Sequence, residues 1–217
     1  MNKLEYIKQG VIGDKVSLNK LSFAETANLI LVSDTHGDYT SLIRIFNQYG
    51  KNSDAVLFSG DGLNDFLYII NEALSNKEFQ TCLPPILFYV LGNSDIMRTP
   101  ITLKKAGATF SYEEMTEVVL KFPENLFITI CGIKILLTHG HNFFVEYNLY
   151  DLMNFAKKNE CSIAVYGHTH FPFNEKIGNI RLINPGSTKS PRRGANKSFA
   201  ILSLQKNGES ELNFVGL

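Results

Sequence analysis

The sequence predicts an α/β fold in which two packed β-sheets are covered by helices. In the first two thirds of the chain, short continuous apolar runs alternate with segments of helical periodicity. This strand–helix–strand order implies crossover connections and a largely parallel sheet. In the last quarter, tight-turn dipeptides separate short alternating runs, and this pattern predicts antiparallel hairpins.

The first half of the chain is predicted to alternate strands with helices. Asn28–Ser33 is a continuous apolar run that ends in polar residues, which is typical of a buried strand. Thr40–Tyr49 has apolar residues at helical spacing, and either Asp38 or Thr40 could cap this helix. By the same reasoning the next elements are a strand at Asp54–Ser59, a helix at Leu63–Asn76 and a strand at Ile86–Leu91.

The second half adds strands, a helix and two hairpins. Ile133–Thr138 and Ser162–Tyr166 are predicted as strands, and Val145–Asn159 between them is predicted as a helix. Phe171–Asn184 and Ser198–Phe214 are predicted as hairpins, because a Gly-Asn and an Asn-Gly dipeptide separate their alternating runs.

Length and charge restrict the class of protein. The chain has 217 residues, so we expect a single domain over residues 1–217. Within it, residues 1–27 form an N-terminal extension whose structure the pattern does not predict, and the same holds for residues 97–123. Lys and Arg together number 21, as do Asp and Glu, so the formal net charge is +0. This balance argues against nucleic acid as a partner and against an anionic membrane surface.

The ends and the cysteines indicate a cytoplasmic protein. Charges interrupt the apolar stretches near the N-terminus, so no signal peptide is expected. The apolar run Leu126–Leu137 is too short to span a bilayer. Cys82, Cys131 and Cys161 are far apart, which predicts buried reduced thiols rather than disulfides or a metal site.

A polar cluster follows each of the predicted buried strands, and all 5 histidines of the chain lie in these clusters. Ligands bind at the carboxyl ends of strands in open α/β sheets, so the clusters are expected to converge. Each cluster alone could be a turn or a cap, but their combination is not explained by a core. The clusters are Asp34-Thr35-His36-Gly37, Gly60-Asp61-Gly62, Gly92-Asn93-Ser94-Asp95, His139-Gly140-His141 and Gly167-His168-Thr169-His170.

These residue types predict a metal centre. Imidazole together with carboxylate oxygen suits manganese, iron, zinc and similar divalent ions, and no thiolate contributes. The number of ligands exceeds what one ion needs, so two ions that share one carboxylate are expected. Such a pair is a template for in-line displacement at phosphorus.

The order DTH, GD, GNSD, HGH, GHTH resembles the calcineurin-like metallophosphoesterase superfamily. GNSD, LLTHGH and NPGS at Asn184–Ser187 are similar to its small bacterial and archaeal phosphodiesterases. The resemblance spans about Leu29 to Phe214 and implies a two-sheet sandwich with flanking helices. It also implies hydrolysis of a small phosphoester, with a diester favoured, by a hydroxide that bridges two divalent metals.

The resemblance further implies a role for each residue of the motif. Manganese is favoured as the metal, with nickel, iron, zinc or magnesium as alternatives. Asn93 would also contact the phosphoryl group. The resemblance implies Asp34, His36 and His170 as ligands of the first ion, Asn93, His139 and His168 as ligands of the second, and Asp61 as the bridge.

One departure from the family concerns the proton donor. Ser94 stands where many relatives have a histidine, and its hydroxyl is a poor acid near neutral pH. His141 or water could replace that histidine, or His141 could instead orient His139. Asp95 is expected as a hydrogen-bond acceptor or a turn residue.

Two arginines and two further functions complete the expectations. Arg192 and Arg193 could present positive charge to the substrate, or could lie in a solvated loop. A non-catalytic scaffold, like the retromer subunit that resembles this branch, is the alternative to an enzyme, and a nuclease is disfavoured by the neutral charge. A small homo-oligomer is expected from base rates alone.

Overall fold

The computed structural model describes residues 2–96, 101–103 and 118–217. Its helices are α1 (Lys15–Phe23), α2 (Tyr39–Tyr49), α3 (Leu63–Ser75), α4 (Lys77–Cys82) and α5 (Tyr150–Lys158), with short 3-10 turns η1 (Gly50–Asn52) and η2 (His141–Phe143). Its strands are β1 (Glu5–Lys8), β2 (Val11–Gly13), β3 (Thr26–Val32), β4 (Ala55–Phe58), β5 (Ile86–Tyr89), β6 (Ile101–Leu103), β7 (Val118–Leu120), β8 (Asn125–Ile130), β9 (Ile133–Thr138), β10 (Ile163–Val165), β11 (Phe173–Ile177), β12 (Ile180–Asn184), β13 (Ser198–Gln205) and β14 (Ser210–Gly216).

The strands form two main sheets. The larger is seven-stranded in the order β1-β2-β5-β4-β3-β13-β14, and the smaller is five-stranded in the order β11-β12-β10-β9-β8. In the larger sheet β3, β4 and β5 are parallel, and in the smaller sheet β9, β10 and β12 are parallel. The outer strands pair antiparallel in both. The parallel arrangement expected from the strand–helix–strand order is confirmed for β3, β4 and β5, and antiparallel strands extend this centre so that each complete sheet is mixed.

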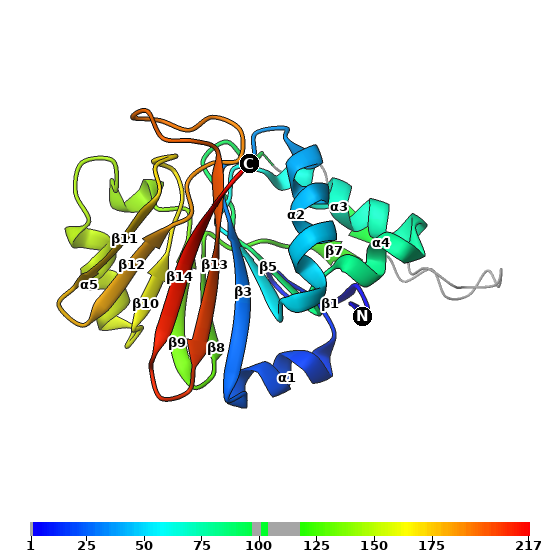
Figure 1. The fold of residues 1–217 in the computed structure, drawn as a ribbon, viewed down its shortest axis with the longest axis horizontal. Helices are drawn as coiled ribbons and strands as arrows, with labels where there is room; N and C mark the ends of the chain where they lie inside the picture. Colours follow the sequence, from blue (N-terminus) through cyan, green and yellow to red (C-terminus); the bar gives the residue numbers. More distant parts are fainter. Residues whose placement is uncertain (1, 97–100, 104–117) are drawn as a thin grey trace.

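The two sheets pack face to face and helices cover their outer faces, as Figure 1 shows. Leu29 and Leu31 of β3 point into the core between the sheets. The alternate residues Ile30 and Val32 pack in the cluster that includes residues of α2 and α3. Because β3 is buried on both faces, its sequence is a continuous apolar run.

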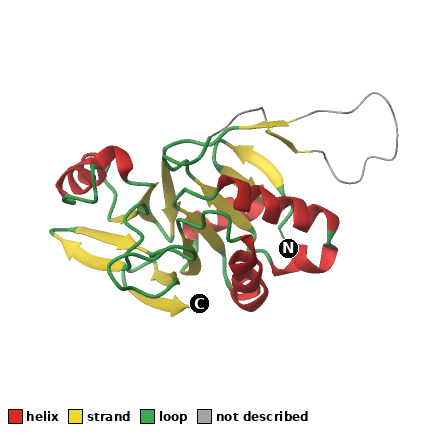
Figure 2. Ribbon diagram, turned by 90° about the horizontal axis from the view of Figure 1, so that it is seen from above, coloured by secondary structure: helices red, strands yellow, loops and turns green. Residues whose placement is uncertain are grey.

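On the other side, α5 packs against the smaller sheet. Leu152 and Ala156 of α5 lie in one apolar cluster with Leu136, Ala164 and Leu182 of the sheet. Figure 2, seen from above, shows the same layers with helices outside and strands between them. The predicted two-sheet sandwich with flanking helices is confirmed.

The predicted strands and hairpins are confirmed within a few residues, and so are the first two predicted helices. Asp38 caps α2, since its side chain accepts a hydrogen bond from the backbone N–H of Ser41 at 3.3 Å. The third predicted helix is wrong at its start, because it begins at Tyr150 and not at Val145. Residues 144–147 form a turn instead, in which Tyr147 N donates to Phe144 O at 3.0 Å, and Asn148 Oδ1 accepts from Tyr150 N at 2.9 Å where the helix begins.

Several elements were not predicted. The extension contributes β1, β2 and α1, and α1 is capped by Asp14, whose carboxylate accepts from Ser17 N at 2.9 Å. Further along the chain, α4 and β8 were also missed. The three cysteines are buried and unpaired, as expected. In residues 2–96, 101–103 and 118–217, no helix has both the length and the apolar character that crossing a membrane requires.

Candidate metal centre

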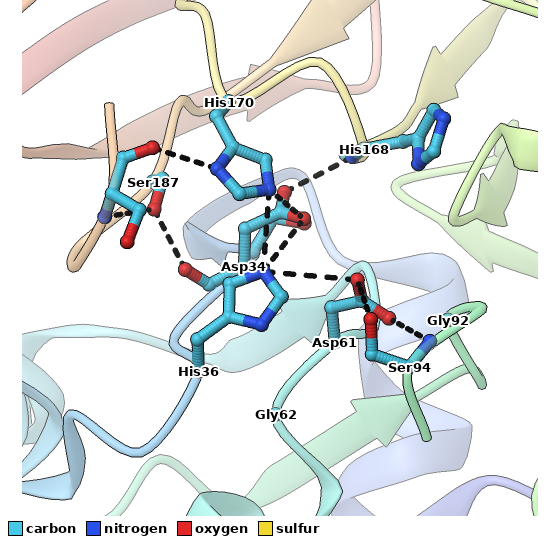
Figure 3. A network of polar contacts seen from close by, with 12 residues as sticks. Asp34, His36, Asp61, Gly62, Gly92, Ser94, His168, His170 and Ser187 are labelled. Carbon is cyan, nitrogen blue, oxygen red and sulfur yellow. Dashed lines mark hydrogen bonds and ion pairs between the residues drawn. The ribbon is translucent and has the colours of Figure 1, made fainter. Parts of the chain in front are cut away.

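The polar clusters converge because each follows the carboxyl end of a central strand. Asp34, Asp61 and Asn93 follow β3, β4 and β5, which run in parallel in the larger sheet. His139 and His168 follow β9 and β10, which run in parallel in the smaller sheet. The loops from both sheets meet at one edge of the sandwich, and Figure 3 shows the side chains that they bring together.

The backbone of these loops is unusual at the predicted ligands themselves. A left-handed backbone is uncommon for any residue except glycine, and it clusters at functional sites because surrounding contacts must hold it. The loops are tied to each other, since Asp34 N donates to Gly60 O at 3.0 Å and His36 N to Asp61 O at 3.1 Å. Positive φ angles occur at Asp34 (54°), His36 (42°), Asp61 (55°), His168 (66°) and His170 (55°).

The first group of potential ligands consists of Asp34, His36 and His170. His170 Nε2 lies 3.2 Å from Asp34 Oδ1 and 3.2 Å from His36 Nε2. His170 Nδ1 lies 2.7 Å from the carbonyl oxygen of Ser190, which can only accept, so the ring hydrogen is on Nδ1. In the neutral ring, Nε2 therefore presents a lone pair to a carboxylate oxygen.

Asp34 shows that this arrangement needs a positive charge. The side chain is fully buried, and its Oδ2 accepts from the backbone N–H of His168 at 3.0 Å. Its Oδ1 has no hydrogen-bond partner among the described residues. A buried carboxylate oxygen that faces imidazole lone pairs is stable only beside a cation, which is a proton or a metal ion. The donor set thus fits a divalent ion.

The second group contains Asn93, His139 and His168. His139 Nδ1 lies 2.6 Å from the carbonyl oxygen of Ser59, so its Nε2 presents a lone pair to the site. Asn93 Oδ1 lies 3.1 Å from this Nε2 and 3.0 Å from His168 Nδ1. An amide oxygen and two imidazole nitrogens at these separations can converge on one ion.

Asp61 lies between the two groups. Its Oδ2 is 3.7 Å from His36 Nε2 on one side and 3.4 Å from His139 Nε2 on the other. Ser94 donates to the same carboxylate, from its backbone N–H to Oδ1 at 2.8 Å and from its hydroxyl to Oδ2 at 2.9 Å. Figure 3 shows this carboxylate next to both Ser94 and His36. The Asp61 carboxylate thus lies within 4 Å of a histidine of each group.

The pKa values reflect the same demand for positive charge. Burial lowers the pKa of His139, but hydrogen bonding to Asp61 and the charge of Asp34 outweigh burial and raise it. Burial likewise opposes a charged His170, and Asp34 raises its pKa overall. Burial raises the pKa of Asp61, yet His139 and Ser94 hold it far below its ordinary value. In the metal-free protein, protons on the histidines therefore compensate the carboxylates.

Asp95 holds the loops after β4 and β5 together. Its two carboxylate oxygens accept hydrogen bonds from both loops and from the buried hydroxyl of Tyr89 at 2.7 Å. The expected role of Asp95 as a hydrogen-bond acceptor is confirmed. The backbone donors are Gly92 N at 2.8 Å, Asp61 N at 2.9 Å, Gly62 N at 3.0 Å and Leu63 N at 2.9 Å.

His141 lies beside the second group. Its ring centroid is 5.4 Å from that of His139 and 6.2 Å from that of His168. Its Nδ1 is buried and has no hydrogen-bond partner in the part of the chain that the structure describes. The outer nitrogen of His139 is held by the Ser59 carbonyl, so the orienting contact that we considered for His141 is made by the backbone.

The two arginines lie in the loop after His170. The backbone N–H of Arg192 donates to His170 O at 3.1 Å, and both arginine side chains are exposed. The Arg193 guanidinium lies over the ring of Phe171, 5.6 Å from its centroid. The structure thus brings both arginines near the first group without a contact to its ligand atoms, and their role in substrate binding stays a prediction.

Two residues support the ligands from behind: Ser187 of the NPGS motif, which the sequence indicated, and Asp65, which it did not. Ser187 donates from its hydroxyl to Asp34 O at 2.7 Å and accepts from Ser190 N at 2.9 Å, so it links Asp34 to the segment that holds His170 (Figure 3). Asp65 accepts from Gly37 N at 2.8 Å and from the Thr35 hydroxyl. The NPGS motif signalled the serine, whereas no local signal marked Asp65.

Comparisons with known proteins agree with this geometry. The sequence model of the "Calcineurin-like phosphoesterase superfamily domain" matches residues 28–207. The chain is 24% identical over 180 residues to a probable metallophosphoesterase, YsnB of Bacillus subtilis, covering 83% of this chain and 86% of that protein. It is 27% identical over 185 residues to a phosphodiesterase of Methanocaldococcus jannaschii, covering 84% and 96%. The fold is also similar to Vps29 of Entamoeba histolytica complexed with Zn²⁺, with a TM-score of 0.54 and 18% identity, covering 87% of this chain and 98% of that one.

Proposed function

The chain belongs to the calcineurin-like phosphoesterase superfamily, and from this premise we propose that it hydrolyses a small phosphodiester at a centre of two divalent ions. The observation that carries the proposal is the convergence of lone pairs from both sheets on a buried carboxylate without a partner. A phosphodiester is favoured over a monoester because a relative that matches 84% of the chain is named a phosphodiesterase.

We divide the ligands between the ions by their contacts. Asp61 would be shared, because its Oδ2 lies between His36 and His139. When bound, the two ions would lower the pKa of a water molecule and neutralise charge on the phosphoryl oxygens. Oxygen and imidazole ligands suit manganese, which we propose as the metal. Asp34, His36 and His170 would hold the first ion, and Asn93, His139 and His168 the second.

The remaining groups at the centre would bind the substrate and handle the proton. Asn93 turns its Oδ1 toward the histidines, and its Nδ2 donates one hydrogen to the Ser94 hydroxyl at 3.4 Å, which leaves the second hydrogen for a phosphoryl oxygen. A cavity of about 160 Å³ adjoins the centre and is lined by His36, Asp61 and Ser94, among others. This volume suits the phosphoryl group and one compact substituent of a diester, whose second substituent would extend out of the cavity.

His141 is our candidate for the proton donor, because the Ser94 hydroxyl is already engaged with Asp61. Burial and the charge of His139 lower the pKa of His141, so its protonated form is scarce at neutral pH. The enzyme should therefore favour substrates whose leaving group needs little protonation. Arg192 and Arg193 would contribute positive charge at the rim.

The test is hydrolysis of a phosphodiester and a phosphomonoester that both release nitrophenol. Metal-free protein is assayed first, and manganese, nickel, zinc or magnesium is then added in turn. We expect metal-dependent turnover that favours the diester and disappears with a chelator. Because nitrophenol leaves without an acid, a negative result could not be attributed to Ser94. An unchanged rate after thorough chelation would exclude the proposal.

A scaffold without catalysis is the second candidate, because the fold is similar to that of Vps29. That likeness concerns the fold alone. Metal binding does not separate the two functions, since the solved Vps29 structure is described as a complex with Zn²⁺. Turnover does separate them, so protein that binds two ions and hydrolyses neither nitrophenyl ester would support the scaffold.

A further inference from the structure

His168, which is half-buried, presents its ring to the site in the opposite sense from the buried His139 and His170. Its Nδ1 lies 3.0 Å from Asn93 Oδ1, and its Nε2 points to the outside of the centre. His139 and His170 instead present Nε2 to the site and turn Nδ1 outward. If Nδ1 is to remain free for an ion, the ring hydrogen of His168 must be on Nε2, and the group that accepts it must lie next to Nε2.

Backbone carbonyls fill the outer position for the other two rings. The carbonyl oxygen of Ser59 lies 2.6 Å from His139 Nδ1, and that of Ser190 lies 2.7 Å from His170 Nδ1. At the same outer position of His168 there is a side chain, since Glu146 Oε2 lies 3.5 Å from Nε2. Each outer group is an oxygen that can accept a hydrogen from the ring.

The carboxylate of Glu146 is suited to this contact. Its Oε2 is buried and has no hydrogen-bond partner among the residues that the structure describes. Burying a charged oxygen without a donor is costly, so the oxygen gains by taking a nearby N–H group. At 3.5 Å the contact is slightly longer than an ordinary N–H···O bond, and a small rotation of the Glu146 side chain would close it.

The local backbone explains how Glu146 reaches His168. Phe144 has a left-handed φ of 51° and ends η2, and residues 144–147 form a turn before α5 begins at Tyr150. Val145 is buried in the cluster under α5, beside Tyr166. This anchor fixes the next residue, Glu146, at the rim of the centre and not on the surface of a helix.

We infer that Glu146 is a positioning residue, which holds the hydrogen of His168 on Nε2 and so keeps Nδ1 free to bind the second ion. The inference rests on the two-ion centre of the proposed function. Carboxylates behind metal-binding histidines fix the tautomer and raise the basicity of the ligand. Loss of such a partner lowers metal affinity by about 10–100-fold in general.

The test measures metal affinity directly, without turnover. Metal-free full-length protein is titrated with Mn²⁺ by calorimetry, and the two binding steps are compared between variants. For Glu146→Leu we expect the second ion to bind about 10–100-fold more weakly, with the first unchanged. Glu146→Gln should recover part of this loss, because its amide oxygen still accepts. Glu124→Leu is the matched control, since Glu124 contacts Asn142 of the same loop at 3.0 Å.

A second measurement reads the tautomer itself. Nitrogen-15 shifts of the His168 ring in Zn²⁺-loaded wild-type protein should show the hydrogen on Nε2, and the fraction of this tautomer in metal-free protein should fall in Glu146→Leu. Unchanged affinity together with an unchanged tautomer would overturn the inference. The inference would also be overturned if Glu146→Leu weakened the binding of both ions equally, or if Glu124→Leu weakened metal binding as much as Glu146→Leu does. Either result would indicate a general disturbance of the loop.

The outcomes separate this inference from the proposed function. Wild-type protein that binds two ions without turnover would refute phosphoester hydrolysis and leave the role of Glu146 standing if the variants behave as expected. Wild-type protein that binds fewer than two ions would remove the second site, and the inference with it.

Discussion

Replacement of Asp95 by asparagine is expected to destabilise the protein through the loops that carry the ligands. The carboxylate accepts from Gly92 N, Asp61 N and the Tyr89 hydroxyl at Oδ2, and from Gly62 N and Leu63 N at Oδ1. Asparagine has one acceptor oxygen. If that oxygen takes the place of Oδ2, an NH₂ group faces two backbone N–H groups that it cannot bind.

The magnitude follows from these two donors. A hydrogen bond to a charged acceptor contributes about 1.5–3 kcal/mol. Leu63 N loses its bond fully, while Gly62 N keeps the Tyr89 hydroxyl as a partner at 3.3 Å. We therefore expect Asp95→Asn to lower the free energy of unfolding by about 2–4 kcal/mol. In the opposite orientation of the amide, its NH₂ group would face the three donors to Oδ2, and the loss of unfolding free energy would be larger.

Urea denaturation of the metal-free protein measures this loss. With an m-value of about 2–3 kcal/mol per molar, the midpoint should fall by roughly 1 M urea. Asp151→Asn, which removes an exposed carboxylate on α5, is the control. A loss below about 1 kcal/mol in Asp95→Asn, equal to that of the control, would refute the reasoning, because it would mean that the network does not restrain the loops.

Three further predictions concern the centre itself. Asp61→Asn removes the negative charge that lies between the two groups and should reduce diester hydrolysis by about 1000-fold or more, which is about 4 kcal/mol of transition-state stabilisation. The control variant Asp151→Asn should stay within about twofold of the wild-type rate. A loss under tenfold in Asp61→Asn would contradict the bridging position. Because the folded pKa values of His139 and His170 are raised, their stabilisation of the metal-free protein is full below about pH 6.5 and is lost as pH rises through the folded pKa values. Thermal melting from pH 6 to 9 should thus show falling stability without metal, and a flat profile would argue against these pairs. Gly92→Ala should weaken metal binding as measured by calorimetry, because a Cβ at this position would lie 2.1 Å from Asp61 Oδ1 and must displace that carboxylate. Unchanged metal affinity would contradict this prediction and show that the loop adapts.

The elements that could be predicted are those buried on both faces. In β3 and β4 every residue from Leu29 to Val32 and from Ala55 to Phe58 is buried, so the sequence is uninterrupted apolar. In β8 only alternate residues are buried, and the exposed Phe127 obscures that alternation. The start of α5 could not be predicted because Val145 and Leu149 continue the apolar spacing of the helix, whereas the structure places residues 144–147 in a turn.

The candidate ligands could be predicted because each directly follows a recognisable strand. The orientation of each ring could not, since it depends on groups that are remote in sequence. The carbonyl oxygen that holds His139 belongs to Ser59, 80 positions earlier, and the one that holds His170 is 20 positions later. Such partners are determined by how the two sheets pack, and a local motif contains no information about them.

The origin of the ligands in two different sheets has a mechanical consequence. His36 follows a strand of the larger sheet, while His170 follows the smaller one, and the two side chains are 134 positions apart in the chain. An ion held by both side chains would act as a cross-link between the two sheets at one edge of the sandwich. Metal loading should therefore slow hydrogen exchange in the strands on both sides of that edge, and separation of the sheets would have to begin at the opposite edge.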